Sequence, residues 1–386
     1  MRYKFGDLIE EVTERNSNLK YGLDDTIGVT IEKGLIPTVA NLSQTALDKF
    51  YIVRRNTFIY NPRTHGVRIG MGFNKTDKVY ITSWNNVAFK VKKTAESIVN
   101  PNYLWLYFCR SEWDRETNYY ALGSSTIVFL WSIFLDIEID LPEKSIQDSI
   151  VDKYRILQDR IELKEKINDN LDEQMNALFK SWFVDFDPFN VSEESSIPNG
   201  WTQTKLGDYV TYTQGTQVPV EDQYESPADN RIRFLRIVDY TGTTNDPPRY
   251  IDKKRKNSCC NPDDILIIRY GASAGQICRG FTGVFANNLF SITPEKRLTK
   301  SFLYYLLKQS TVQSFITSVG ETSSAMPALT HGLISAIPFA LPDTDDYINK
   351  FSVIADKCFI QQMNNAKEIE QLLLLQNNIL QSLLSR

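Results

Sequence analysis

The sequence predicts an α+β protein in which two similar globular α/β domains are joined by two long helices that form an antiparallel coiled coil. Two observations predict this fold. Several segments of the 386-residue chain return about 200 residues later, which indicates a duplicated module and not a solenoid repeat of 20–50 residues. Each copy then ends in a stretch of roughly 40 residues whose apolar residues recur at helical spacing.

The duplication sets the expected domain boundaries. Segments 4–8, 85–89, 103–111 and 137–142 return as 205–209, 287–290, 302–310 and 337–342. We therefore expect a globular domain over residues 1–142, a long helix over 143–187, a linker over 188–200, a second globular domain over 201–342 and a second long helix over 343–386. Strand-like runs in both domains lie at 49–53, 57–60, 232–237 and 264–268.

The helical stretches carry apolar residues mostly three and four positions apart. The first contains no Gly or Pro before Pro188, where it is expected to end, and a helix of about 40 residues spans on the order of 60 Å. The residues expected to form its stripe, and to contact partner helices, are Ile150, Leu157, Ile161, Leu171, Leu178 and Trp182. Those of the second helix are Phe351, Ile354, Leu372, Ile379 and Leu383.

Polar residues interrupt the second stripe at Gln361, Gln362, Asn364 and Asn365. Buried polar residues can fix the register of a coiled coil, but a solvated segment carries the same residues, and both interpretations stay open. Because the apolar stripes need to be covered, the helices either pair with each other or form a homodimer. We favour antiparallel pairing within the chain, which would put the two domains at opposite ends of a rod.

Composition and charge limit the class of protein. Hydrophobic residues make up 42% and charged residues 23%, and no run reaches the roughly 18 apolar residues of a membrane span. The N-terminus lacks the apolar region of a signal peptide, and the five cysteines have no disulfide or metal spacing, so we expect a cytoplasmic protein. The net charge of −4 predicts weak stand-alone binding to nucleic acid, with a partner supplying part of the positive charge.

We expect no catalytic, metal or cofactor site. Asn61-Pro62 and Asp187-Pro188 each lack the second proline of the loop in which adenine methyltransferases hold their target base. The glycine-bearing segments 69–73 and 271–275 lack a cofactor fingerprint and are interpreted as hairpin turns. The sequence has only two histidines, His65 and His331, so it offers few candidates for a histidine that acts as general acid or base.

Basic residues interleaved with aromatic residues give the clearest binding signal, since Arg and Lys bind phosphates and Arg also reads guanine. The candidate DNA contacts of the first copy are Arg54, Arg55, Arg63, Arg68 and Lys75. Those of the second copy are Arg231, Arg233, Arg236, Arg249, Lys253, Lys254, Arg255, Lys256 and Arg269. A charge run such as 249–256 is more often a solvated face, so that alternative also stays open.

Several motifs occur in a fixed order along the chain. Leu-Pro pairs at 141–142 and 341–342 lead into the helices, segments 178–183 and 185–189 close the first helix, segment 201–208 restarts the module, and segment 320–342 ends it. Their order and spacing resemble the specificity subunit (HsdS) of type I restriction–modification systems over essentially the whole chain.

The resemblance implies two target-recognition domains, each reading one half of a bipartite, asymmetric site in double-stranded DNA. It implies that the helices act as a spacer and as the docking surface for methyltransferase subunits, expected to be two, with restriction or translocase subunits as further partners. The chain itself is then non-catalytic, without cofactor, metal or membrane contact, because adenine methylation and cleavage belong to the partners. The alternatives are a coiled-coil scaffold with two heads that do not bind DNA, and a stand-alone DNA methyltransferase with degenerate motifs.

Overall fold

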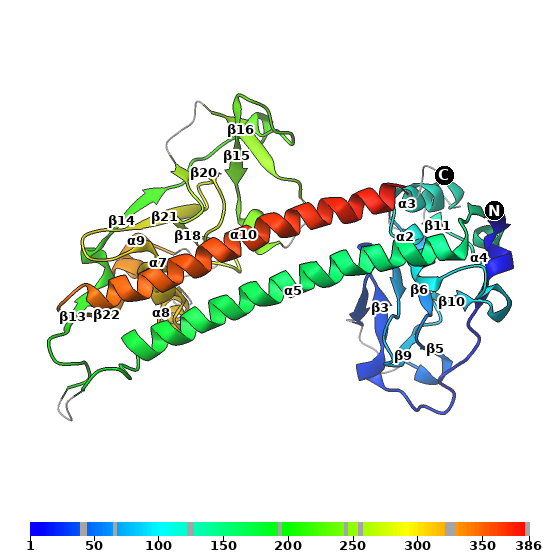
Figure 1. Ribbon diagram of the computed structural model, residues 1–386, viewed down its shortest axis with the longest axis horizontal. Helices are drawn as coiled ribbons and strands as arrows, with labels where there is room; N and C mark the ends of the chain where they lie inside the picture. Colours follow the sequence, from blue (N-terminus) through cyan, green and yellow to red (C-terminus); the bar gives the residue numbers. More distant parts are fainter. Residues whose placement is uncertain are drawn as a thin grey trace. The chain divides into compact units, whose positions relative to one another are not determined.

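The computed structural model describes residues 1–38, 45–64, 68–121, 127–191, 195–242, 246–253, 258–320 and 329–382. The chain forms two compact units: unit 1 is Met1–Leu163 with Ile369–Arg386, and unit 2 is Lys164–Glu368. Two long helices, α5 (Lys144–Phe183) and α10 (Asp346–Ser382), contribute residues to both units (Figure 1).

Unit 1 is built on an antiparallel sheet with the strand order β2 (Ile9–Glu11), β10 (Val87–Val91), β6 (Phe58–Tyr60) and β8 (Met71–Phe73). Two-stranded ladders accompany it: β1 (Arg2–Lys4) with β12 (Glu138–Asp140), β3 (Ile27–Val29) with β4 (Leu35–Pro37), β5 (Tyr51–Val53) with β9 (Tyr80–Thr82), and β7 (Arg63–Thr64) with β11 (Ile127–Val128). Its short helices are α1 (Phe5–Leu8), α2 (Pro101–Phe108), α3 (Ser111–Tyr120) and α4 (Trp131–Asp136).

Unit 2 has a sheet with the order β14 (Val210–Gln214), β21 (Leu289–Pro294), β18 (Ile265–Ile268) and β19 (Ile277–Cys278), and a ladder of β13 (Thr202–Lys205) with β22 (Pro338–Leu341). A second sheet has the order β16 (Arg249–Asp252), β15 (Arg231–Leu235), β20 (Gly283–Phe285) and β17 (Cys259–Cys260). The short helices are α6 (Ile237–Thr241), α7 (Lys300–Lys308), α8 (Ser310–Gly320) and α9 (His331–Ser335).

The two units repeat one plan. Strands β2, β10, β6 and β8 correspond in order to β14, β21, β18 and β19, and the ladder β1–β12 corresponds to β13–β22. The N–H of Phe5 donates to the carbonyl of Ile137 over 3.0 Å, and the N–H of Leu206 donates to that of Ile337 over 2.9 Å. The repeat in the sequence is therefore a repeat of tertiary contacts.

A glycine follows each of these contacts because the backbone passes close to a neighbouring helix. A Cβ on Gly6 would lie 3.1 Å from the carbonyl oxygen of Leu135 in α4, and one on Gly207 would lie 2.7 Å from Cβ of Ser335 in α9. A larger residue would require the neighbouring helix to shift within a close-packed interior, by a few tenths of an ångström at Gly6 and by more at Gly207. The glycine at positions 6 and 207 therefore recurs for packing.

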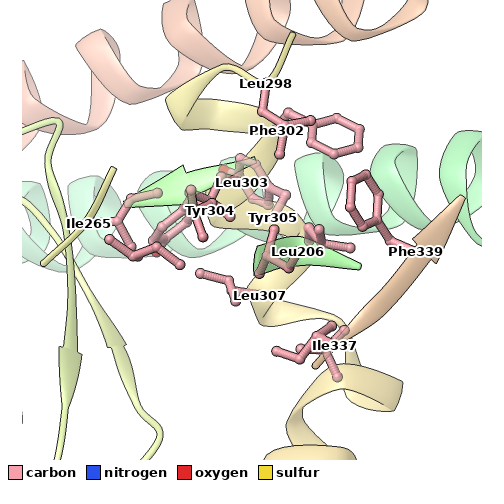
Figure 2. Packing of buried hydrophobic residues seen from close by; sticks show 14 of the residues in the cluster. Leu206, Ile265, Leu298, Phe302, Leu303, Tyr304, Tyr305, Leu307, Ile337 and Phe339 are labelled. Atoms are coloured by element: carbon pink, nitrogen blue, oxygen red, sulfur yellow. The ribbon is translucent and has the colours of Figure 1, made fainter. Parts of the chain in front are cut away.

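Each core includes its own part of the long helices. In unit 2, Phe179 and Phe183 of α5 lie 5.1 and 4.9 Å from the ring of Phe302 in α7, and Phe351 of α10 lies 5.3 Å from Phe179. Figure 2 shows Phe302 within the same cluster as Phe339 of β22. Burying one phenylalanine stabilises a fold by about 1.5–3 kcal/mol, so the helices are part of the core that holds unit 2 together.

Helix α5 ends earlier than the sequence predicts. Its last residue is Phe183, and the N–H groups of Val184 and Asp185 both donate to the carbonyl of Lys180. Phe186 then adopts φ +59°, a left-handed conformation that turns the chain out of the helix before Pro188 is reached. Helix α5 therefore ends because of the backbone geometry at its own last turn, and not because of Pro188.

The long helices pair antiparallel in both units. In unit 2, Trp182 lies 6.3 Å from the ring of Tyr347, whereas Lys164, earlier in α5, pairs over 2.9 Å with Glu368, later in α10. In unit 1, Nε2 of Gln376 donates to Oε1 of Gln158 over 3.0 Å. The predicted fold class is confirmed, with the apolar stripes covered within one chain.

A polar layer interrupts the seam in unit 2. Asn365 is 1% exposed, and its Nδ2 donates to Oδ1 of Asn168 over 2.7 Å. Its Oδ1 accepts from Nζ of Lys164 (3.0 Å) and from Nε2 of Gln361 (2.9 Å). Nε2 of Gln362 donates to the carbonyl of Asn168 over 3.0 Å. Because a buried polar network is costly unless all its partners are in place, the layer favours one register of the two helices.

A buried ion pair fixes a loop of unit 1. Nζ of Lys33, in the turn between β3 and β4, pairs with Oδ1 of Asp114 in α3, and the two side chains are 7% and 11% exposed. Lys33 also donates to the carbonyl of Ile69 over 2.8 Å, and the N–H of Ile69 donates to Asp114 over 3.2 Å. Burial lowers the pKa of Lys33, and the contact with Asp114 opposes that shift.

One of the two glycine-bearing segments differs from its predicted structure. Segment 69–73 does not form a hairpin turn: Met71–Phe73 are β8, and a Cβ on Gly72 would lie 2.2 Å from Cδ2 of Leu35, so glycine is needed there for close packing. Segment 271–275 is a hairpin turn as expected, with Gly271 and Gly275 at φ +84° and +91°.

We predict that Asn365→Leu lowers the free energy of unfolding by about 1–3 kcal/mol, because it leaves buried polar groups of Asn168 and Lys164 without partners. Adding Asn168→Leu should restore part of that loss, since both polar partners are then apolar. Equilibrium denaturant unfolding measures both changes. Asn364→Leu, at the exposed neighbouring position, is the control and should change the free energy by less than about 0.5 kcal/mol. An Asn365→Leu variant as stable as the wild type would contradict this role.

We also predict that Lys33→Met lowers the free energy of unfolding by about 3 kcal/mol, because the carboxylate of Asp114 stays buried without its counter-charge. The double variant Lys33→Met, Asp114→Leu should recover a large part of that loss. The measurement is denaturant unfolding, with the exposed Lys93→Met as the matched control. A single variant no less stable than the double variant would show that the pair does not anchor unit 1.

Candidate nucleic-acid interface

One group of the candidate basic residues is neutralised within the chain. In unit 1, Arg54 binds Glu14 with two hydrogen bonds of 2.6 and 2.9 Å, and Arg55 donates to Asp77 over 2.8 Å. A guanidinium held by a carboxylate has to exchange that partner before it can bind a phosphate. These two arginines are therefore less suited to DNA contact than their sequence position alone indicates.

Three arginines of unit 2 form a continuous ion-pair network. Arg233 and Arg236 lie 3.3 and 3.4 Å from Asp239, and Arg236 and Arg249 lie 2.8 and 3.7 Å from Asp246. The network joins β15, α6 and β16, so its first effect is to hold the second sheet together.

Lys75 belongs to a contact that both units repeat. Its Nζ lies 5.9 Å from the ring centroid of Trp105 in α2. At the equivalent place after β19, Arg279 lies 3.6 Å from the ring of Tyr304 in α7 and 4.1 Å from that of Phe359 in α10. A cation over an aromatic face contributes about 0.5–2 kcal/mol, and its presence in both copies points to packing.

Arg231 and Lys253 are held by neutral groups. Arg231 lies 3.6 Å from the ring centroid of Tyr224, and Nζ of Lys253 donates to the carbonyl of Asp229. Both keep their positive charge without a carboxylate partner among the described residues. The candidates Lys254, Arg255 and Lys256 lie outside the described residues.

Arg63 and Arg68 are exposed in the connection between β6 and β8. Neither has an ion pair with another residue that the structure describes. Arg68 immediately precedes Ile69, whose backbone is bound by Lys33 and Asp114. Sequence reasoning singled out these arginines but not the buried pair, because residues 33 and 114 carry no local pattern that links them.

Arg269 is held by an amide. Its Nη1 donates to Oε1 of Gln214 over 3.1 Å, and Nε2 of Gln214 donates to the carbonyl of Asn287 over 2.7 Å. The guanidinium lies 5.0 Å from the ring centroid of the exposed Tyr270. Nε of Arg269 and Oδ1 of Asn288 are buried without a hydrogen-bond partner among the described residues. Guanidinium, amide and aromatic groups are those that contact bases. The sequence singled out Arg269 but not Gln214, which lies far away in the chain.

His331 packs beside this group. Its ring stacks on that of Tyr212, with centroids 4.5 Å apart and an interplanar angle of 4°. Burial, and then the charge of Arg269, lower the pKa of His331, which keeps the imidazole neutral at physiological pH. Its role in the structure is that of a packed ring. His65 lies outside the described residues.

Most of the expected helix contacts are buried or half-buried, and some of them pack against the core of a unit, as Ile150 does in unit 1 and Trp182 in unit 2. Ile161, Phe351 and Leu372 are buried, and the half-buried members of the set are Ile150, Leu157, Leu171, Leu178, Trp182 and Ile379. Ile354 is 39% exposed, and Leu383 lies outside the described residues. Other apolar residues of these helices are exposed: Ile156, Leu163, Leu373, Leu374 and Leu375 in unit 1, and Ile167, Val353 and Ile360 in unit 2.

Metal-binding clusters and membrane-spanning helices are both absent from the described part of the chain. No group of three or more His, Cys, Asp or Glu side chains is arranged there to hold a metal ion. None of the helices described combines the length and the hydropathy that a membrane span requires.

No protein-family model matches the chain. In sequence it is similar to the type I restriction enzyme MjaIX specificity subunit of Methanocaldococcus jannaschii, at 27% identity over 265 residues, 64% of this chain and 60% of that protein. It is also similar to the type I restriction enzyme HindI specificity subunit of Haemophilus influenzae, at 33% identity over 113 residues, 28% of this chain and 24% of that protein. The matched part is less than two thirds of either relative's length.

The fold is similar to the crystal structure of the type I restriction–modification system S subunit from M. genitalium. The TM-score is 0.57 at 16% sequence identity, and the match covers 99% of this chain and 95% of that chain. The similarity at this identity concerns the fold. The resemblance that the motif order suggests is thereby confirmed: the chain is related in sequence and in fold to the specificity subunits of type I restriction–modification systems.

Proposed function

We propose that this chain is the DNA sequence-specificity subunit of a type I restriction–modification complex, and that each globular domain binds one half of a bipartite, asymmetric site in double-stranded DNA. The observation that carries the proposal is one fold plan present twice with different surfaces. The strand orders agree, whereas the connections 61–70 and 269–275 differ in length and in charged residues. Two similar scaffolds with different surface chemistry suit two different half-sites.

The proposed target-recognition domains are residues 1–142 and 201–342, with residues 188–200 as a linker. The helices over 143–187 and 343–386 would serve as a spacer. Helices α5 and α10, which begin at Lys144 and Asp346, support this division, since each is continuous and paired with the other in both units. A paired helix resists bending, so the spacer would keep the gap between half-sites constant.

The basic residues would then divide by task. Arg63, Arg68, Arg231, Lys253 and Arg269, which have no carboxylate partner among the described residues, are the proposed DNA contacts. The ion-paired arginines would mainly hold the scaffold. With a net charge of −4, tight binding would depend on a basic partner that supplies further positive charge.

The proposed partners are methyltransferase subunits, two of them, which dock on the exposed sides of the long helices, with restriction or translocase subunits joining the complex. Leu373, Leu374 and Leu375 support this, because all three are exposed on α10 and, at about 100° per residue, Leu373 and Leu374 point away from the buried Leu372. Two paired helices with apolar flanks are half of a four-helix bundle, which further helices could complete.

Catalysis would belong to those partners, and the proposed place of action is the cytoplasm. A stand-alone methyltransferase would bind S-adenosylmethionine, whereas this proposal expects the purified chain not to bind it. A scaffold with heads for other ligands would show no DNA binding with or without a methyltransferase subunit. Neither alternative is favoured by a specific observation.

We predict that replacing residues 1–142 by the corresponding domain of another specificity subunit changes one half of the recognised site and leaves the other half intact. The measurement is a genome-wide map of adenine methylation in a host that carries the chain and its methyltransferase partner. Replacing residues 201–342 is the reciprocal control and should change the opposite half. A change in both halves after either replacement would refute modular reading.

We predict that Leu373→Gln combined with Leu374→Gln weakens assembly with the methyltransferase subunit at least tenfold, since both side chains would be buried against it. Light scattering of the mixed subunits measures assembly, and denaturant unfolding checks that the chain stays folded. Asn378→Ser, at an exposed position of the same helix, is the control. Unchanged assembly of the leucine variant would remove this face as the docking surface.

A further inference from the structure

One connection occupies the same place in both units. Tyr60 of β6 pairs with Val87 of β10, and Ile268 of β18 pairs with Leu289 of β21. Val87 follows Asn85-Asn86, and Leu289 follows Asn287-Asn288 in the repeated segment. Their strand partners Tyr60 and Ile268 are therefore equivalent positions. The segments that come next, of which the structure describes 61–64 and 68–70 in unit 1 and 269–275 in unit 2, are therefore the same element of the duplicated plan.

The start of each connection is held in the same way. The N–H of Phe129, just before α4, donates to the carbonyl of Pro62 over 2.8 Å. The N–H of Leu329, just before α9, donates to the carbonyl of Arg269 over 3.0 Å. The acceptor is the second residue after Tyr60 in unit 1 and the first after Ile268 in unit 2, so both connections are tied at their start to the segment before the next short helix, although their backbones are not identical.

Each of these two connections carries arginine without a carboxylate partner among the described residues. Arg63 and Arg68 lie on the first and Arg269 on the second, and none of the three has an ion pair with another described residue. The arginines on β15 and β16, in contrast, are held by Asp239 and Asp246. Guanidinium groups without a carboxylate partner, on the corresponding connection of two similar domains, indicate a common task.

Each connection is also held by hydrogen bonds from neighbouring side chains. In unit 1, Lys33 and Asp114 bind the carbonyl and the N–H of Ile69, next to Arg68. In unit 2, Gln214 of β14 occupies one N–H of Arg269 and is itself fixed to the carbonyl of Asn287. Bracing of this kind limits the freedom of a side chain that has to meet a ligand at a defined angle.

We infer that these equivalent connections read base pairs in the two half-sites, with Arg269, oriented by Gln214, reading a guanine in one half-site and Arg63 and Arg68 reading bases in the other. The inference rests on the proposed function. A guanidinium has five N–H donors, so Arg269 keeps donors for O6 and N7 of guanine while Gln214 holds Nη1. Tyr270, exposed beside it, supplies an aromatic face for the same strand.

The test is selection from a pool of random-sequence DNA duplexes by the full-length chain, purified with the methyltransferase subunit that it assembles with. The wild-type complex should enrich a bipartite sequence. Arg269→Ala should reduce discrimination about tenfold or more at one or two base pairs of one half-site, and leave the other half-site unchanged. Arg63→Ala with Arg68→Ala should relax the other half-site only.

A second variant keeps the test valid if Arg269→Ala fails to fold. Gln214→Glu, at an exposed position, retains Arg269 but gives it a carboxylate partner, so the same base pairs should lose discrimination. Lys93→Ala and Lys205→Ala remove one exposed positive charge from each unit away from the connections, and they should leave both half-sites intact. Unfolding midpoints of all variants are measured alongside.

The outcomes separate the two proposals. If the wild-type complex enriches no sequence, the proposed function itself fails. If the wild type selects a site and the variants keep full discrimination, the assignment of the connections is overturned while the function stands. If the arginine variants lose the same affinity for every DNA sequence, the assignment is also overturned, because such a loss indicates contacts to phosphates and not to bases.

Discussion

The apolar stripes of α5 and α10 have to be covered, and the way they are covered organises both units. Part of each stripe is covered by the opposite helix, and part by the core of a globular domain, where Phe179, Phe183 and Phe351 pack around Phe302. Since each such side chain contributes about 1.5–3 kcal/mol on burial, separating the helices would also disrupt that core. The helix pair is therefore part of the folded units and not an appendage to them.

The polar layer around Asn365 adds selectivity to a seam that apolar contacts alone would leave tolerant of slippage. Apolar side chains pack in several registers at similar cost, whereas Asn168, Lys164 and Asn365 satisfy one another only when they face each other. In the spacer role that we propose for the helices, a fixed register matters more than maximal stability. The polar layer supports that proposal because it favours one register.

The charged side chains fall into two groups, those that form ion pairs within the chain and those without such a partner. Carboxylates hold Arg54, Arg233 and Arg236 in place, and the buried pair of Lys33 and Asp114 braces a loop from inside. Arg63, Arg68 and Arg269, which lie on the connections after β6 and β18, have no such carboxylate partner among the described residues and are therefore available for the proposed DNA contact.

The duplication, the two long helices and the strands near 51–53, 58–60, 231–235 and 265–268 could be predicted from the sequence. Repeated segments and side-chain periodicity are visible in the order of the residues, without knowledge of tertiary contacts. The sequence also supplied the family resemblance. Tertiary structure decided where α5 ends, that segment 69–73 contributes a strand packed against Leu35, and which arginines are neutralised. Those outcomes depend on residues far apart in the chain, such as Gln214 and Arg269, or Lys33 and Asp114, whose meeting no local pattern encodes.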